Sequence, residues 1–439
     1  MRVDYLGLSE INGNLVILEG VDSPVYDEIV EISIPSGSGL VKTGRVIQID
    51  EDRITVLVYE GAWDFSLTNT RTCFTGRPME IRLSDDILGR VFDGLGRPID
   101  GFGPVYGPSF PINGKAISPV LRAYPKDHIR TGLSAIDGMA TLVRGQKLPI
   151  FSADGLPHDQ LAAQIARQAD VADKDNFAVV FAAMGVKYDA AEFFRRSFGE
   201  SGQLSRTVMF LNLANDPAVE RIITPRCALT AAEYLAFERG MHVLVVLTDM
   251  TAYAEALREI SSAKGEIPSR KGYPGYLYSD LASLYERAGV LRGCKGSLTQ
   301  IPILTMPGDD ITHPVADLTG YITEGQIVLD RSLHQRGIYP PINVLPSLSR
   351  LMKDCIGENR TRADHPVLSN RLFAAYAQVG DARALASVIG VDELSYEDKA
   401  ILKFGDRFEA EFVGQGIYEN RGLHESLDKG TKILNEINM

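Results

Sequence analysis

The chain has 439 residues, of which 45% are hydrophobic and 23% charged, and its formal net charge is −12. This length allows two or three domains with substantial cores, and the negative charge argues against a nucleic acid or an anionic membrane as the main partner. No apolar run is long enough to span a bilayer, and the N-terminus lacks the apolar core of a signal peptide, so we expect a cytoplasmic protein. The four cysteines and seven histidines show no metal-ligand spacing, so we expect no metal site and reduced thiols.

The N-terminal part has the pattern of short β-strands separated by turns. Val, Ile and Thr dominate these strands, and polar and apolar residues alternate in the last of them. The expected strands are Leu15–Leu18, Ile29–Ile34, Gly44–Ile49 and Ile54–Tyr59, with turns at Pro35–Gly39 and Asp50–Asp52. We therefore predict an antiparallel β-barrel over residues 1–75. The Gly-, Asp- and Pro-rich segment 89–125 is expected to contain no regular element.

Residues 76–347 alternate apolar strands with helical patterns, which predicts a doubly wound α/β domain. The buried strands expected here are Phe177–Met184, Thr207–Asn212 and Met241–Leu247, and a helix is expected over Ala228–Arg239. Residues 348–439 show apolar spacings of three and four, which predicts a C-terminal helical bundle. The expected helices of this bundle are Asn370–Val379, Ala382–Ile389, Tyr396–Phe412 and Leu423–Ile437.

One stretch of the central domain, residues 148–168, has the layout of a phosphate-binding loop. A short apolar run leads into a turn of small residues, and the turn opens an Ala-, Gln- and Leu-rich helix. A working loop needs glycines whose N–H groups converge on phosphate, a Lys for the phosphate charge and a Ser or Thr for magnesium. An ordinary strand–helix turn that never bound phosphate is the alternative.

The chemical positions of this loop are changed. Ser152 and Pro157 stand where the two glycines belong, His158 replaces the Lys, and Asp159 replaces the Ser or Thr, so that Gly155 is the glycine that remains in the turn. Pro157 has no N–H to donate, and a carboxylate about 4 Å from a phosphate charge would cost ~4 kcal/mol at an effective dielectric of 20. We interpret the stretch as a degenerate phosphate loop, in which Asp159 is expected to cap its own helix.

Two further positions bear on this interpretation. Asp249 follows the strand Met241–Leu247, where a nucleoside triphosphatase places an acid that reaches magnesium through water. Asp also starts many ordinary turns, and this alternative stays open. The turn Gly185–Tyr188, after the first long strand, lacks the Glu that would orient an attacking water. The phosphate cradle, the Lys and the base are therefore missing together.

Several long strings of the sequence resemble one family very specifically. They are SADGLPHDQLAAQIARQA, LTDMTAYAEALREIS, IPSRKGYPGYLYSDLASLYERAG, TMPGDDITHPVADLTGYITEGQI and GIYPPINVLPSLSRLM. With these strings the chain resembles the non-catalytic B subunit of V-type and A-type rotary ATPases, from Val41 to about Gly416. The sister catalytic subunit carries an intact phosphate loop and a base, both of which are absent here.

The resemblance implies a hexameric ring in which B chains alternate with catalytic A chains around a rotating stalk. ATP or ADP with Mg²⁺ would lie at the interface and be bound mainly by the A chain, with no nucleotide held tightly by this chain alone. The resemblance also implies that Arg350 acts across the interface as an arginine finger. From the residues alone, an Arg paired to a carboxylate at a domain hinge is the interpretation we favour, and the resemblance reverses this preference. Peripheral and central stalk subunits would be further partners, on the cytoplasmic side of a membrane that the chain itself does not enter.

An acidic stretch between two expected helices is similar to the segment by which ring subunits touch the rotor. Its acids are Asp392, Glu393, Glu397 and Asp398, and a helix start capped by Ser395 and Asp398 explains them equally well. The function we favour is a regulatory subunit that couples ATP synthesis or hydrolysis to proton or sodium transport. A self-sufficient ATPase would need a Lys at His158, and a passive ring subunit would have an inert Arg350.

Overall fold

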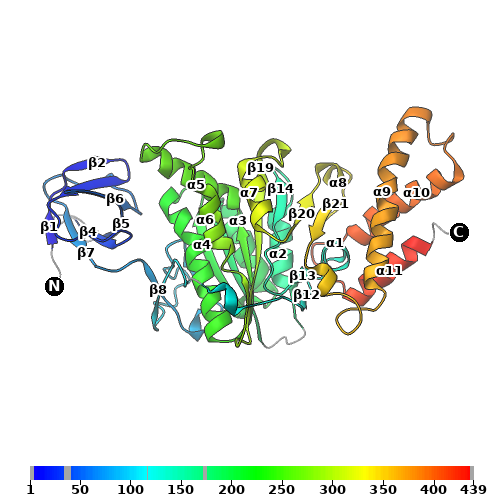
Figure 1. The fold of residues 1–439 in the computed structure, drawn as a ribbon, viewed down its shortest axis with the longest axis horizontal. Coiled ribbons are helices and arrows are strands. Elements are labelled where there is room, and N and C mark those ends of the chain that lie inside the picture. Colours follow the sequence, from blue (N-terminus) through cyan, green and yellow to red (C-terminus); the bar gives the residue numbers. More distant parts are fainter. Residues whose placement is uncertain (1–3, 34–40, 116, 172–175, 436–439) are drawn as a thin grey trace.

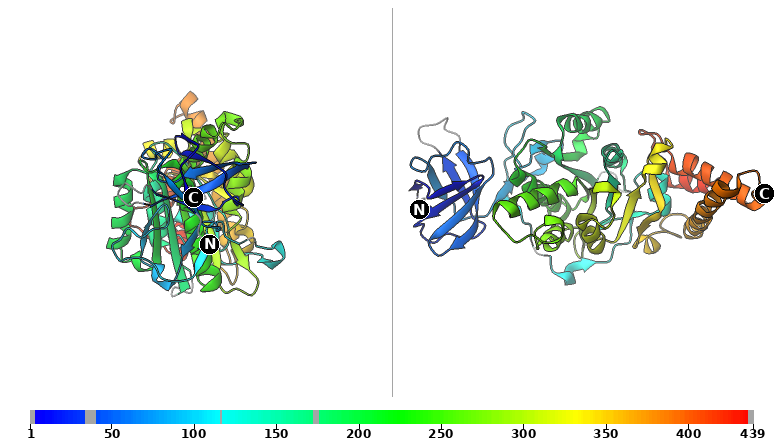
Figure 2. Two further views of the ribbon diagram at one scale, coloured as in Figure 1. Left: turned by 90° about the vertical axis from the view of Figure 1, so that its left-hand side faces the viewer. Right: turned by 90° about the horizontal axis from the view of Figure 1, so that it is seen from above.

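The computed structural model describes residues 4–33, 41–115, 117–171 and 176–435. Three units lie in a row (Figures 1 and 2), with a β unit at one end, an α/β unit in the middle and a helical unit at the other end. No described helix is both long enough and apolar enough to cross a bilayer. The predicted fold class is confirmed.

The N-terminal unit is a curled sheet in which every neighbouring pair of strands is antiparallel. Its interior is an apolar cluster that includes Val16, Val30, Ile32 and Val56, none of them exposed. In spatial order the strands are β1 (Asp4–Leu6), β7 (Arg71–Phe74), β4 (Ile29–Ser33), β5 (Val41–Asp50), β6 (Arg53–Val58), β3 (Leu15–Glu19) and β2 (Glu10–Asn12). The turn predicted at Pro35–Gly39 lies outside the described residues.

The central sheet is almost entirely parallel. Its main path runs β21 (Ile342–Ser349), β20 (Gly325–Leu329), β14 (Ile150–Ala153), β19 (Ser297–Met306), β17 (His242–Thr248), β15 (Phe177–Val186), β16 (Thr207–Leu213) and β9 (Val91–Asp93). Among these strands β21 alone runs against its neighbour. The short strands of the remaining pairs are β8 (Glu80–Arg82), β10 (Ser109–Pro111), β11 (Arg122–Ala123), β12 (His128–Ile129), β13 (Leu142–Val143) and β18 (Gly289–Leu291).

Alternate residues of the central strands pack into two separate apolar cores, one on each face of the sheet, because successive side chains of a strand point to opposite faces. Val180 of β15 packs on one face and Phe181 on the other. Helices α4 (Ala218–Glu233), α5 (Met250–Ala263), α6 (Leu277–Tyr285) and α7 (Pro314–Ile322) pack into the first core. Helices α2 (His158–Gln168) and α3 (Tyr188–Glu200) pack into the second, which continues to α1 (Ser134–Met139) and the C-terminal helices.

The C-terminal unit consists of α9 (His365–Ile389), α10 (Tyr396–Arg407), the π-helical turn η9 (Phe408–Val413) and α11 (Leu423–Asn435). Phe404, Phe408 and Phe412 stack in succession, with ring centroids 5.6 and 5.0 Å apart. These rings are buried, so they hold the unit against the second core of the sheet.

Three predictions about helices and strands were wrong. The two helices expected over residues 370–389 are one helix, α9, because Gly380 and Asp381 lie within it. The helix expected from Ala228 begins at Ala218 and contains Pro225. The segment 89–125 does hold short strands, and one of them, β9, forms an edge of the central sheet.

A buried carboxylate joins the helical unit to the central one. Glu409 of η9 is 2% exposed and accepts hydrogen bonds from Arg383 (2.7 and 2.9 Å), Arg336 and the Tyr376 hydroxyl (2.6 Å). Arg336 follows α8 (Arg331–Gln335), so the bonds cross between the units. Burial opposes ionisation of Glu409, but these donors outweigh it and lower the pKa of its carboxyl.

Glu409→Gln should destabilise the chain by about 3 kcal/mol at pH 7, because two guanidinium groups would lose their buried counter-charge. A lowered folded-state pKa means that the ionic contribution is complete above the unfolded pKa of about 4.3 and disappears as the pH falls through the lower folded value. The difference in unfolding free energy from the unmodified chain should therefore shrink below pH 4 in urea titrations. Glu411→Gln, which breaks a surface pair with Arg407, is the control and should cost ~0.5 kcal/mol.

Candidate functional site: the phosphate loop and Arg350

The predicted loop connects β14 to α2 at the carboxyl edge of the parallel sheet, which is the usual ligand edge of such folds. Gly155 has φ +80° and an open surface, so the turn itself has the shape that a glycine permits. Pro157 is the N-cap residue of α2, and no side chain bonds to the first turn of the helix. Asp159 therefore makes no capping hydrogen bond, but it lies in the first turn of α2, where a helix N-terminus favours an anion.

The interactions of the loop are internal to the chain. The buried Ser152 hydroxyl lies 3.1 Å from His158 Nδ1, and the backbone N–H of His158 donates to the Leu156 carbonyl at 2.8 Å. The Asp159 carboxylate lies 3.8 Å from His158 Nε2, and burial raises the pKa of the Asp159 carboxyl. Groups that would face phosphate are thus bound to one another.

Arg331 is a further cation at this loop, and sequence patterns gave no signal for it. Its guanidinium donates to the Asp154 carbonyl at 2.9 Å and to both carboxylate oxygens of Asp309 at 2.8 Å. Asp309 comes from the turn after β19, so the pair joins three segments around the loop. A bidentate carboxylate satisfies this guanidinium, which therefore is not a free substitute for the missing Lys.

Asp249 ends β17 and caps α5. One carboxylate oxygen accepts the N–H of Thr251 at 2.8 Å and of Thr305 at 3.2 Å, and the other accepts the Thr305 hydroxyl at 2.5 Å. Burial raises the pKa of the Asp249 carboxyl. These bonds fit the alternative role of Asp249, the start of the next helix. The turn expected at Gly185–Tyr188 is shorter in the structure, because β15 continues to Val186 and α3 begins at Tyr188. Within the end of β15, the Gly185 N–H donates to the side-chain carbonyl of Asn212.

Arg350 lies at the opposite edge of the sheet from the phosphate loop. Strand β20 is parallel to β14 and leads from Gly325 toward the loop, whereas β21 returns antiparallel, so that Ser349 pairs with Gly325. The length of β20 thus separates the two sites by roughly 15 Å at ~3.3 Å per residue. The Arg350 side chain is exposed, and among the described residues its guanidinium has no hydrogen bond or ion pair. The alternative, in which Arg350 pairs with a carboxylate at a hinge, is not seen among the described residues.

The acids of the predicted rotor contact lie in and after the loop between α9 and α10. Ser395 caps α10 by accepting the Asp398 N–H at 3.0 Å, and its hydroxyl donates to the Asp398 carboxylate at 2.6 Å. Asp392, Glu393 and Glu397 are exposed. The structure therefore contains both features that were predicted: Ser395 and Asp398 cap the helix start, and the other three acids form an exposed acidic surface.

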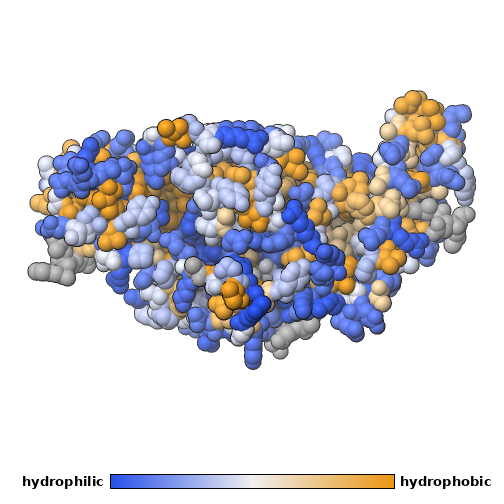
Figure 3. Space-filling view, in the orientation of Figure 1, coloured by the Kyte–Doolittle hydropathy of each residue, from blue (hydrophilic) through white to orange (hydrophobic). Residues whose placement is uncertain are grey.

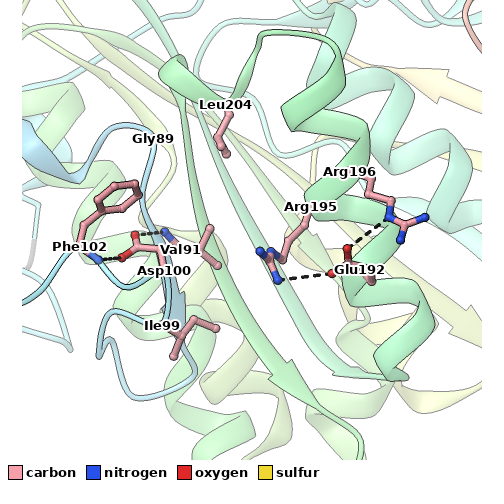
Figure 4. A pocket seen from close by; sticks show the side chains of 9 residues that line it. All are labelled: Gly89, Val91, Ile99, Asp100, Phe102, Glu192, Arg195, Arg196 and Leu204. Atoms are coloured by element: carbon pink, nitrogen blue, oxygen red, sulfur yellow. Dashed lines mark hydrogen bonds and ion pairs between the residues drawn. The ribbon is translucent and has the colours of Figure 1, made fainter.

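A pocket of about 280 Å³ lies elsewhere, between α3 and the β9 segment (Figure 4). Arg195 and Arg196 both point toward Glu192, at 3.4 and 3.2 Å, and Asp100 is bound by Arg90. The predicted site residues are absent from its lining, and its charges are paired. The described residues contain no cluster of His, Cys, Asp or Glu suited to a metal ion.

A central α/β domain with a loop at this edge, a β-barrel before it and helices after it define the ATP synthase alpha/beta class of proteins. Family models match in the same order: the beta-barrel domain over residues 8–62, the nucleotide-binding domain over 132–349, and the C-terminal domain of V and A type ATP synthases over 354–438. The chain belongs to the family of V-type ATP synthase beta chains and their A-type counterparts, as its relatives show.

The chain is 61% identical to the V-type ATP synthase beta chain of Halothermothrix orenii, over 99% of this chain and 94% of that protein. It is 58% identical to the B subunit of the A-type ATP synthase of Aeropyrum pernix, over 98% and 93%. A solved structure of NeqB, an ATP synthase component of Nanoarchaeum equitans, matches with a TM-score of 0.77 and 42% identity, over 97% of this chain and all of that one.

The isolated chain should bind ATP weakly and almost independently of magnesium, because Pro157, His158 and Asp159 replace the phosphate-binding groups. The triple variant Pro157→Gly, His158→Lys and Asp159→Thr should gain at least ~10-fold in affinity, since one hydrogen bond to a charged group contributes about 1.5–3 kcal/mol. Calorimetric titration with ATP, with and without Mg²⁺, measures the affinity of the unmodified chain and of the triple variant. Sub-micromolar, magnesium-dependent binding by the unmodified chain would contradict the degenerate loop.

Proposed function

We propose that this chain is the non-catalytic, regulatory B subunit of a rotary ATP synthase, and that it completes the ATP site of a neighbouring catalytic A subunit. One observation carries the proposal: the loop has Pro157, His158 and Asp159 at the positions of the phosphate-binding groups, while Arg350, whose guanidinium has no partner among the described residues, is exposed at the opposite edge of the same sheet. The chain would therefore supply a residue to a site that it does not itself contain.

The separation of the two edges supports a ring. Head-to-tail contacts join two different surfaces of neighbouring chains, and they close into a ring when the rotation between neighbours closes. In an alternating hexamer of A and B chains, Arg350 would face the nucleotide of one A neighbour, and the degenerate loop would face the other. Arg350 would not reach the loop of its own chain.

ATP or ADP and Mg²⁺ would be held by the A subunit, because the B-chain loop does not fit them. Their chemistry is phosphoryl transfer, which spreads negative charge over the transferred group. The guanidinium of Arg350 would stabilise that charge from across the interface. Arg suits this role because its planar fork stays charged and bonds two oxygens, whereas Lys is a point charge on a flexible stem.

The ring would couple ATP synthesis or hydrolysis to proton or sodium transport through central and peripheral stalk subunits. It would lie on the cytoplasmic side of the membrane, which the chain would meet only through the rest of the complex. The tip of the helical unit is the proposed rotor contact. It is apolar on the face seen in Figure 3, and Val388, Val391 and Tyr396 are exposed beside Asp392 and Glu393. Apolar residues next to exposed charges are typical of a protein interface.

Arg350→Ala should lower ATP turnover of the reconstituted A–B ring by ~10³- to 10⁵-fold, the contribution known for arginine fingers. Assembly and nucleotide occupancy should change far less, since the interaction belongs mainly to the transition state. Arg350→Lys should restore activity only in part. Turnover is measured by phosphate release and occupancy in parallel on the same rings.

Arg53→Ala is the matched control, because Arg53 is an exposed arginine of the β unit with only surface ion pairs to Glu10 and Glu19. Its rings should keep full turnover. If Arg350→Ala rings retain more than about a tenth of normal turnover, far above the loss expected of a finger, Arg350 is not one. The chain would then be a passive component of the ring.

Neutralising the rotor contact with Asp392→Asn and Glu393→Gln should weaken binding of the central stalk to the ring by ~5-fold at low salt. The effect should fade above about 0.5 M salt, because screening removes interactions between exposed charges. Co-sedimentation at several salt concentrations measures it. Glu51→Gln with Asp52→Asn removes equal charge at the opposite end of the molecule and should have no effect; equal losses for both pairs would contradict a specific contact.

A further inference from the structure

A lysine is buried at the edge of the sheet where Arg350 emerges. Lys147 precedes β14 and is 5% exposed, and its ammonium lies 2.7 Å from Glu286 Oε1 and 2.9 Å from Glu324 Oε1. Its backbone N–H also donates to Glu324 Oε2 at 2.9 Å. A buried ammonium is costly unless it is paired and hydrogen-bonded, and here both conditions hold. The phosphate loop, about one strand length away, does not use it.

Glu324 connects Lys147 to the backbone of Arg350. Its backbone carbonyl accepts the N–H of Arg350 at 2.9 Å, and its own N–H donates to the Lys147 carbonyl at 3.2 Å. The Glu324 side chain and backbone are thus both tied to Lys147, while the same carbonyl holds the backbone of Arg350.

Gln146 bonds to the residues on either side of this contact, Glu324 and Ser349. It is fully buried, and its amide NH₂ donates to the Glu324 carbonyl at 3.2 Å and to the Ser349 hydroxyl at 2.9 Å. The strands also approach closely here, since a Cβ on Gly325 would lie 2.3 Å from the Leu348 carbonyl oxygen. The backbone leading into Arg350 is therefore restrained on two sides, although the Arg350 side chain is exposed.

We propose that Gln146, Lys147 and Glu324 form an edge clamp of positioning residues, which fixes the backbone at Arg350 so that its guanidinium meets the nucleotide of the neighbouring chain. This rests on the function proposed above for Arg350. None of the three residues touches the nucleotide; they act through Arg350. A misplacement of about 1 Å at a reacting group costs up to ~10²-fold in rate, which is why a flexible side chain benefits from a fixed base.

The first test is Lys147→Met in the reconstituted A–B ring. Met keeps the chain length and removes the charge, which leaves Glu324 without its counter-ion. Turnover should fall roughly 10- to 100-fold, whereas the KM for ATP and the nucleotide occupancy should stay within about 3-fold, because only the transition state needs the aligned guanidinium.

A milder variant and a control accompany it. Ser349→Ala removes only the bond from Gln146 and should lower turnover by ~3- to 10-fold, the value of one hydrogen bond; it keeps the test valid if Lys147→Met rings do not assemble. Lys42→Met is the matched control. Lys42 is a poorly exposed lysine of the β unit that bonds Asp64 and, at 2.8 Å, the Gly61 carbonyl. Its rings should keep full turnover.

A double-mutant cycle separates positioning from general damage. Single-turnover hydrolysis resolves the low rates of Arg350→Ala rings, to which Ser349→Ala and Lys147→Met are each added. If the clamp acts through Arg350, neither addition lowers the rate further. Additive losses, or unchanged turnover in both clamp variants with Arg350 present, would overturn the clamp and leave the function of Arg350 standing. Normal turnover of Arg350→Ala rings would overturn both.

Discussion

The polarity of the central sheet is the constraint on which both sites depend. In a parallel sheet all carboxyl ends meet at one edge, and the loop after β14 must lie there. Strand β21 reverses direction, so it starts at the loop edge and ends at the opposite one. This single reversal places Arg350 a strand length away from the loop of its own chain. A molecule with this topology has two unlike edges, which a head-to-tail ring requires.

The loop between β14 and α2 is held by interactions within the chain. Asp154 offers its carbonyl to Arg331, whose charge is neutralised by Asp309, and His158 faces Ser152. With Asp159 added, acidic groups equal or outnumber cations at this edge. A polyphosphate at this loop would meet two basic side chains, Arg331 and His158, that already have partners, and it would have to compete with those partners. These pairs support the proposal of a loop that keeps the layout of a phosphate cradle while its polar groups bond within the chain.

The elements predicted best from the sequence are those that a local hydrophobic pattern determines. The long apolar runs around Phe181 and Val245 are buried on both faces, and such runs identify strands of a covered parallel sheet. The expected break at residues 380–381 did not occur, because a helix tolerates one glycine at a cost of about 1 kcal/mol when packing holds the helix, here through the buried Val379 and Ala382. Arg331 was missed for a different reason: its partners lie 22 and 177 residues away, and no local pattern encodes such a pairing.

Arg350 was predicted from family resemblance, and its role on a neighbouring chain stays a proposal that its surroundings in the structure support. Many other arginines are paired with carboxylates, as Arg287 is with Glu233 at 2.7 Å. Arg350 combines a fixed backbone with a guanidinium that has no partner among the described residues. Ordering a free arginine side chain costs up to ~2 kcal/mol, whereas ordering its backbone as well would cost a further ~1–2 kcal/mol. If Arg350 acts on a neighbouring chain as proposed, its fixed backbone would leave most of the interaction energy of the guanidinium for an anion of that chain.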